Sequence, residues 1–188
     1  MNNREIIMAQ SLELFSLKGY DSVGIQEICN NSNITKPTLY HYFGSKTGLL
    51  REIIVENSKK LLEAISQASD YKGDLPLTVN KTVRVYFNFA KNNPHFYRIK
   101  LSSFYAPVES DLFKATEDLR YEEYKLLEGV FIKASQDHGN MKNKQAALAI
   151  TFLGHVSTYI GMWLNNYKHL DEELVFSASH QFMHGIYS

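Results

Sequence analysis

Three stop signals within the first 45 residues divide the start of this chain into short helical segments. Gly19 follows a stretch in which Leu14 and Phe15 belong to an apolar helical face, residues 30–33 (NNSN) interrupt the next such stretch, and Gly44 ends the third. Glycine and asparagine tolerate the left-handed backbone at which helices commonly end. We therefore predict three short helices before residue 45.

The third segment, ITKPTLYHYFGSK at residues 34–46, combines a proline with several aromatic rings in polar surroundings. Thr35 is a good N-cap, and Pro37 then falls in the first helical turn, where its missing N–H is not needed. Leu39 and Phe43 are four residues apart and share one face, which we expect to be buried. The rings left for the remaining surface belong to Tyr40, His41 and Tyr42.

The rest of the chain also follows helical spacing. It has four prolines in 188 residues and no sustained strand-type alternation bounded by hairpin dipeptides. Ser45 should cap a longer helix whose apolar positions continue to Ile65, and Pro94 and Pro107 mark later breaks. We predict an all-α fold in which further helices occupy residues 77–92, 94–104, 109–137, 142–167 and 171–186.

The charged residues are balanced overall but not locally. With 20 basic and 20 acidic side chains, the chain as a whole has no field that would draw it to nucleic acid or membrane. Between Ile28 and Arg51, however, the charged residues are Lys36, Lys46 and Arg51, and no Asp or Glu occurs. Any polyanion site must therefore be local to this region.

Cysteine usage and hydropathy indicate the compartment. Cys29 is the single cysteine, which excludes an internal disulfide and fits a reducing cytosol. No stretch approaches 18 uninterrupted apolar residues. We expect a cytoplasmic protein without membrane contact.

Two short helices joined by a tight turn form a helix-turn-helix pattern, in which the second helix enters the major groove of DNA. The free N–H groups of that helix, next to Thr35, can point at a phosphate. Tyrosine hydroxyls can bond phosphate oxygens, and ring edges can contact thymine methyl groups. The alternative is that these rings are ordinary packing residues and that the lysines are only solvated.

The run GYDSVGIQEICNNSNITKPTLYHYFGSKTGLL resembles the DNA-binding region of the TetR/AcrR family of transcriptional regulators, over about residues 4–52. It shares the LY-x-x-F motif, the lysine that follows and the leucines after it. The resemblance implies a recognition helix, with a phosphate held at its far end by lysine. The DNA-binding positions so assigned, including the helix start, are Thr35, Lys36, Pro37, Thr38, Tyr40, His41, Tyr42 and Lys46.

Three positions depart from the family's pattern. Residues 23–24 (VG) stand where a Thr-Thr or Thr-Ser pair is usual, which weakens the cap of the second helix. Asn33 replaces the glycine of the turn, which is acceptable because asparagine tolerates the left-handed region. Pro37 replaces a small residue, so base contacts at this position should differ.

The resemblance also implies the role of the C-terminal part. We expect a DNA-binding domain at 1–50 and a helical ligand-binding and dimerisation domain at 51–188, with two copies paired through the last two helices. Such a homodimer would read a pseudo-palindromic operator in double-stranded DNA. A small-molecule effector would favour a conformer in which the spacing of the two DNA-binding domains does not match the operator, and so release a repressor from DNA.

The aromatic content predicts the character of that effector. Aromatic residues make up 13% of the chain and cluster around two proline breaks, which would suit a pocket for a largely apolar or aromatic molecule, although core packing explains most of them. Arg98 would suit an acidic group. The candidate pocket residues are Tyr86, Phe89, Phe96, Tyr97, Arg98, Phe104, Tyr105, Tyr121, Tyr124 and Trp163.

Other classes of function have less support in the sequence. There is no nucleotide-binding glycine loop and no nucleophile elbow, so we expect no enzyme and no cofactor. His180 and His184 have chelating spacing but lack two further ligands, so no metal site is predicted. The remaining alternative is a helical small-molecule-binding or scaffold protein without specific DNA binding.

Overall fold

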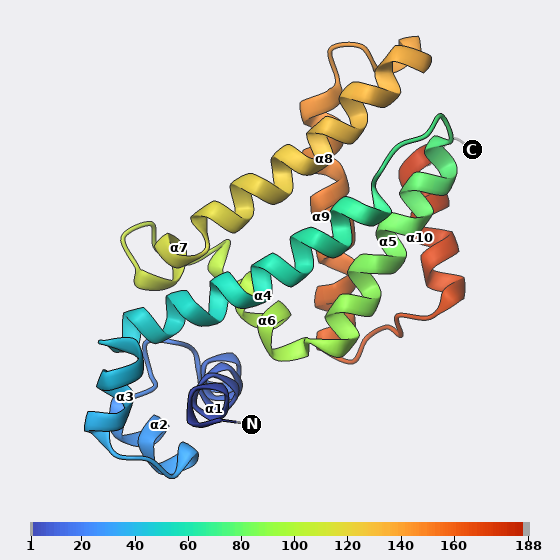
Figure 1. Cartoon of the computed structure of the whole chain (residues 1–188). Helices are drawn as coiled ribbons and strands as arrows, with labels where there is room; N and C mark the ends of the chain where they lie inside the picture. Colours follow the sequence, from blue (N-terminus) through green and yellow to red (C-terminus); the bar gives the residue numbers. More distant parts are fainter. Residues whose placement is uncertain (1, 186–188) are drawn as a thin grey trace. The chain divides into compact units, whose positions relative to one another are not determined.

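The computed structural model describes residues 2–185 and confirms the all-α prediction for them, since they contain no strand. Figure 1 follows the helices along the chain. The helices are α1 (Asn3–Lys18), α2 (Ile25–Ser32), α3 (Lys36–Phe43), α4 (Lys46–Ala68), α5 (Leu75–Asn92), α6 (Pro94–Ser103), α7 (Asp111–Ala115), α8 (Glu117–Asp137), α9 (Gln145–Leu164) and α10 (Glu172–His184), with a short 3-10 turn at Gly139–Met141.

The single helix predicted at 109–137 is wrong, because the chain breaks at Thr116 into α7 and α8. The Thr116 hydroxyl donates to the carbonyl oxygens of Leu112, at 3.0 Å, and Phe113, at 3.1 Å. Such a bond competes with the next helical turn. Ser110 caps α7 by accepting from the Phe113 N–H at 3.2 Å.

The helix predicted at 142–167 is shorter at both ends than expected. Asn143 and Asn166 have φ of 62° and 61°, a left-handed backbone that does not continue a helix, and α9 lies between them. The helix predicted at 171–186 forms as α10, although its last predicted residue lies outside the described residues.

The chain divides into two compact units. Unit 1 contains the residues up to Lys59 together with Pro94–Asp118. Within it α1 packs against α2 and α6, and α2 packs against α3. The core of this unit includes Ile7, Phe15, Tyr20, Ile28, Cys29, Leu39, Leu49, Leu50 and Ile53, all less than 9% exposed. The helix-turn-helix segment is therefore held by a core that a later part of the chain helps to build.

Unit 2 contains Lys60–Asn93 and the residues from Leu119 onward. Here α5 packs against α9 and α10, and α9 packs against α10. Edge-to-face ring contacts fill the space, with Phe152 5.1 Å from Phe182 and 6.2 Å from Tyr86 between ring centroids. These three rings therefore have a packing role.

Candidate nucleic-acid interface

The turn between α2 and α3 is built by three residues, 33–35. Asn33 has φ 51° and ψ 48°, the left-handed conformation expected of it, and the Ile34 N–H donates to the Cys29 carbonyl at 3.0 Å. The predicted break at residues 30–33 is wrong by three residues, because α2 continues to Ser32. Asn31 stays helical with its side-chain amide donating to the Glu27 carbonyl at 2.9 Å.

The start of α3 confirms the predicted cap. Thr35 Oγ1 accepts from the Thr38 N–H at 3.4 Å, and the two threonine hydroxyls lie 2.9 Å apart. Pro37 is in the first turn, where no N–H is required. Because Thr35, Lys36 and Pro37 are all exposed, this helix end faces solvent.

The two faces of α3 differ as the spacing predicts. Leu39 is fully buried and Phe43 is 8% exposed, whereas Tyr40 and Tyr42 are 47% and 41% exposed. The His41 ring is also exposed and makes an edge contact with Tyr42, 5.5 Å between centroids. Rings with polar tips therefore cover the outward face of a helix whose apolar face is anchored in unit 1.

The beginning of α4 lies next to this surface. Ser45 Oγ accepts from the Gly48 N–H at 2.9 Å, which confirms Ser45 as the cap. The Lys46 ammonium lies 4.1 Å from the centroid of the Tyr20 ring, a cation–π contact. Partial burial of Lys46 lowers its pKa, and the carboxylates of Asp21 and Asp111 oppose this shift.

Ion pairs connect α1 to α2 and to α4. Arg4 on α1 pairs with Glu52 on α4 at 2.5 Å, and its guanidinium lies 5.9 Å from the centroid of the Phe43 ring. Lys18 at the end of α1 pairs with Glu27 on α2 at 2.5 Å. These exposed pairs add little stability individually, but they fix the helices against one another.

A polar cluster at the start of α4 was not anticipated from the sequence. Asp111 Oδ2 accepts hydrogen bonds from Thr47 Oγ1 at 2.8 Å and from Tyr20 Oη at 3.0 Å. Burial of Tyr20 raises its pKa to about 12, while the two donors hold the pKa of Asp111 below its ordinary value. No local motif could have found this cluster, because Asp111 lies 91 residues after Tyr20.

The predicted pocket residues are divided between the two units. Five of them belong to unit 1 and five to unit 2. Tyr86, Phe96 and Tyr97 are fully buried, whereas Phe104 and Tyr105 are 65% and 88% exposed. The unit 1 members are Phe96, Tyr97, Arg98, Phe104 and Tyr105; the unit 2 members are Tyr86, Phe89, Tyr121, Tyr124 and Trp163.

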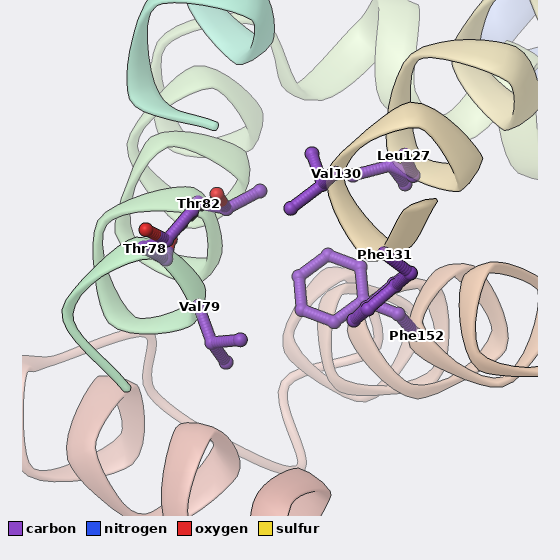
Figure 2. Close-up of a pocket in the computed structure, with 7 residues that line it drawn as sticks. All are labelled: Thr78, Val79, Thr82, Leu127, Val130, Phe131 and Phe152. Atoms are coloured by element: carbon purple, nitrogen blue, oxygen red, sulfur yellow. Dashed lines mark hydrogen bonds between the residues drawn. The ribbon is translucent and has the colours of Figure 1, made fainter. Parts of the chain in front are cut away.

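Unit 2 contains a small apolar cavity of about 10 Å³, shown in Figure 2. Side chains of α5 line one side and those of α8 the other, with Phe152 of α9 beside Phe131. The hydroxyls of Thr78 and Thr82 donate to backbone carbonyls at 2.7 Å, which leaves apolar surface toward the cavity. Its lining is Thr78, Val79, Thr82, Leu127, Val130, Phe131 and Phe152, a set that sequence reasoning did not select.

Two further observations concern α9 and the histidines. By length and composition α9 could span a membrane, which is weak support for such a role, and 22% of its apolar window is buried. Among residues 2–185 no group of three or more His, Cys, Asp or Glu side chains is placed to hold a metal ion. The His180 and His184 rings lie 4.4 Å apart between centroids.

The helix α3 follows a tight turn, buries one face in the core and exposes the other to solvent. This arrangement is characteristic of helix-turn-helix DNA-binding proteins. Residues 7–53 match the sequence model described as "Bacterial regulatory proteins, tetR family". This match covers about a quarter of the chain, and together with the relatives below it supports a DNA-binding transcriptional regulator of the TetR family.

Several curated relatives are transcriptional regulators. The chain is 24% identical over 184 residues to the HTH-type transcriptional activator FasR of Mycolicibacterium smegmatis, covering 96% of this chain and 80% of FasR. It is 38% identical over 64 residues to the HTH-type transcriptional repressor BdcR of Escherichia coli K12, covering 34% of this chain and 32% of BdcR. The second match is confined to about a third of each chain.

Solved structures agree over nearly the whole chain. FadR of Bacillus subtilis, crystallised in complex with stearoyl-CoA, superposes with a TM-score of 0.81 at 15% identity, covering 97% of this chain and 99% of FadR. The fatty acid degradation regulator FadR of Bacillus halodurans gives a TM-score of 0.80 at 14% identity, covering 97% and 98%. At such identities the likeness concerns the fold.

Proposed function

We propose that this protein is a ligand-responsive repressor that binds a pseudo-palindromic operator as a homodimer and is released by a small apolar effector. The observation that carries the DNA-binding part is the two-sided α3, which buries Leu39 and Phe43 and exposes Tyr40 and Tyr42. Exposed rings of this size on a short helix leave apolar area in water unless a partner covers it. The major groove of DNA is a partner of matching size.

Each predicted contact has a physical role in this proposal. The exposed end of α3 at Thr35, Lys36 and Pro37 would approach the DNA backbone, where its free N–H groups and the Lys36 charge favour phosphate. Thr38, Tyr40, His41 and Tyr42 would face the groove. Lys46, held on the Tyr20 ring, would contact a second phosphate.

The test is salt-dependent binding to DNA from around the protein's own gene. A phosphate contact contributes about 0.9 to the slope of log affinity against log salt. We expect Lys46→Ala to weaken binding to all sequences and to lower this slope, whereas Lys142→Ala, an exposed lysine in unit 2, should leave both unchanged. Binding without sequence preference at any salt concentration would overturn the regulator reading.

The proposed effector is a molecule with a long aliphatic chain. The cavity of unit 2 has an almost wholly apolar lining between α5, α8 and α9, and the structurally similar FadR of B. subtilis was crystallised with stearoyl-CoA. At about 10 Å³ the cavity holds one water at most, so an acyl chain must separate these helices to enter. Such an opening is the conformational change that a ligand-responsive repressor requires.

A pair of tryptophan variants on α8 tests this site. Val130 lines the cavity and is 7% exposed, whereas Ile132 on the same helix is 48% exposed. We expect Val130→Trp to force the helices apart as the acyl chain would, and so to bind DNA weakly even without ligand, whereas Ile132→Trp should bind DNA and release it with stearoyl-CoA like the wild type. If Val130→Trp binds DNA tightly and releases it at the wild-type stearoyl-CoA concentration, the effector binds elsewhere.

The homodimer would form through α9 and α10. The outward face of α9 exposes Ile150 and Met162, 62% and 40%, and a hollow of about 480 Å³ is lined by residues of α9 together with Lys168 and Gln181. Gly154 lies in this hollow and allows close approach of a second helix. Polar groups in the same hollow, including His155 and Lys168, favour a protein partner over a bilayer.

Three finer statements belong to the same proposal. The boundary predicted at residue 50 and the C-terminal domain at 51–188 stay predictions. We also propose a cytoplasmic location, because a regulator must be in the compartment that contains its operator DNA. The direction of regulation is decided by transcription of the target promoter, which should rise when the gene for this protein is deleted, and a fall would indicate an activator, as FasR is named.

A further inference from the structure

The polar cluster of Asp111 joins three parts of unit 1 that are distant in sequence. Tyr20 follows the end of α1, Thr47 lies in the first turn of α4, and Asp111 begins α7. One carboxylate oxygen, Oδ2 of Asp111, accepts from both hydroxyls, at 3.0 and 2.8 Å, and the hydroxyls themselves lie 3.3 Å apart. Tyr20 is only 6% exposed, so its orientation is fixed by burial as well as by this bond.

The ring that Asp111 holds is the ring on which Lys46 rests. The Lys46 ammonium lies 4.1 Å from the Tyr20 centroid, and Lys46 precedes Thr47 in the same helical turn. A free lysine side chain has about 2 kcal/mol of rotamer entropy, part of which is lost whenever it is ordered on a partner. A lysine already placed against a fixed ring loses less of it when it binds a phosphate.

From this geometry we infer that Asp111 is a positioning residue for DNA binding. It holds Tyr20 and Thr47 through hydrogen bonds, and these in turn place the Lys46 ammonium for its phosphate. The inference rests on the proposed phosphate contact of Lys46. It adds a role for α7, which lies outside the helix-turn-helix and has no DNA-binding motif of its own.

The charge of Asp111 alone should act in the opposite direction. The two donors lower the pKa of this carboxyl, so it is ionised at neutral pH and repels an approaching phosphate. That repulsion is weak because Asp111 is exposed and the screening length at physiological salt is about 8 Å. If the hydrogen bonds matter more than the charge, removing both must weaken binding, while removing only the charge must not.

Three variants separate these effects. Asp111→Ala removes the charge and both hydrogen bonds, whereas Asp111→Asn removes the charge but keeps a side-chain oxygen that can accept them. Glu109→Ala removes the same charge two residues away, from a carboxylate that pairs with Lys114 at 2.7 Å and is 88% exposed. We expect only Asp111→Ala to weaken operator binding.

The slope of log affinity against log salt concentration shows whether Asp111 acts through the phosphate contact of Lys46. We expect Asp111→Ala to lower the slope by up to about 0.9 per head, as for one lost phosphate contact, and Asp111→Asn and Glu109→Ala to keep the wild-type slope. In a Lys46→Ala background, Asp111→Ala should lower it no further. A purely structural role would reduce the melting temperature and the active fraction without changing the slope of the folded protein.

Each contrary result has a distinct meaning. A wild-type slope for Asp111→Ala beside a lowered slope for Lys46→Ala overturns the positioning role and leaves the proposed function intact. An unchanged slope for Lys46→Ala removes the phosphate contact and the inference that rests on it. A loss in Asp111→Asn equal to that in Asp111→Ala would also overturn the role of the hydrogen bonds. Should Asp111→Ala fail to fold, Thr47→Val with Tyr20→Phe removes the two donors and should lower the slope likewise.

Discussion

The carbonyl oxygen of Phe43 occupies the place that a side chain on Gly48 would take: a Cβ built on Gly48 would lie 2.1 Å from it. The contact joins the end of α3 to the first turn of α4. It requires glycine because the obstacle is backbone, which cannot rotate away as a side chain could. The close packing of the end of α3 against the first turn of α4 therefore requires a residue without a side chain at position 48.

We expect Gly48→Ala to lower the free energy of unfolding by about 1–3 kcal/mol, the usual range for overpacking. Operator affinity should fall as well, since the strain is relieved by moving the end of α3. Gly129→Ala in α8 is the matched control, because its Cβ would meet nothing within 4 Å and should stabilise the helix by about 0.5–1 kcal/mol. Urea unfolding of both variants gives the comparison, and equal shifts would contradict the steric account.

The two faces of α3 should respond differently to truncation. Tyr42→Ala removes a ring that is 41% exposed, so we expect a loss of about 1 kcal/mol or more in operator binding with little change in stability. Leu39→Ala removes a fully buried side chain and should cost about 2–5 kcal/mol of stability. Thermal unfolding and DNA titration of each variant decide between a contact role and a packing role for Tyr42.

Tyr20 should make stability fall at alkaline pH. Its folded pKa is raised to about 12 from an ordinary value of 10.0, chiefly by burial, so the folded state retains a proton that the unfolded state releases. The stabilisation is complete below pH 10 and is lost as pH rises toward 12. Between these values the unfolding free energy of wild type should fall more steeply than that of Tyr20→Phe, and parallel curves would contradict the burial effect.

The proposed dimer face can be tested with a matched pair of arginine substitutions. Ile150 on α9 and Val55 on α4 are 62% and 65% exposed. We expect Ile150→Arg to yield monomers in analytical ultracentrifugation, because a buried charge without a partner opposes association. Val55→Arg should leave the dimer intact. A dimer that survives Ile150→Arg at micromolar concentration would point to another interface.

Local signals predicted much of the fold of the head. Thr35, Asn33 and Ser45 act through neighbours within five residues, so their caps and turns could be inferred from spacing alone. The break at Thr116 could not, because a threonine is compatible with a helix interior and only its hydrogen bonds to the preceding turn reveal the interruption.

Residue spacing predicted one part of the candidate sites but not the parts that depend on long-range contacts. The inward and outward faces of α3 follow from a four-residue interval between Leu39 and Phe43. The Asp111 cluster depends on a contact across 91 residues, and the cavity lining combines three helices. The aromatic residues selected from the sequence belong to both units, because closeness along the chain does not determine which residues line the same cavity.

The make-up of unit 1 limits how such heads can be exchanged between regulators. Its core is shared by two separate stretches of chain, and α1 meets α6 through contacts that include Ser16 Oγ and His95 Nδ1 at 2.7 Å. A chimera that transplants only the first 59 residues would pair a foreign α1 with the α6 and Asp111 of its host. A chimera should therefore keep the operator specificity of the donor only when residues 94–118 are transferred together with the first 59 residues.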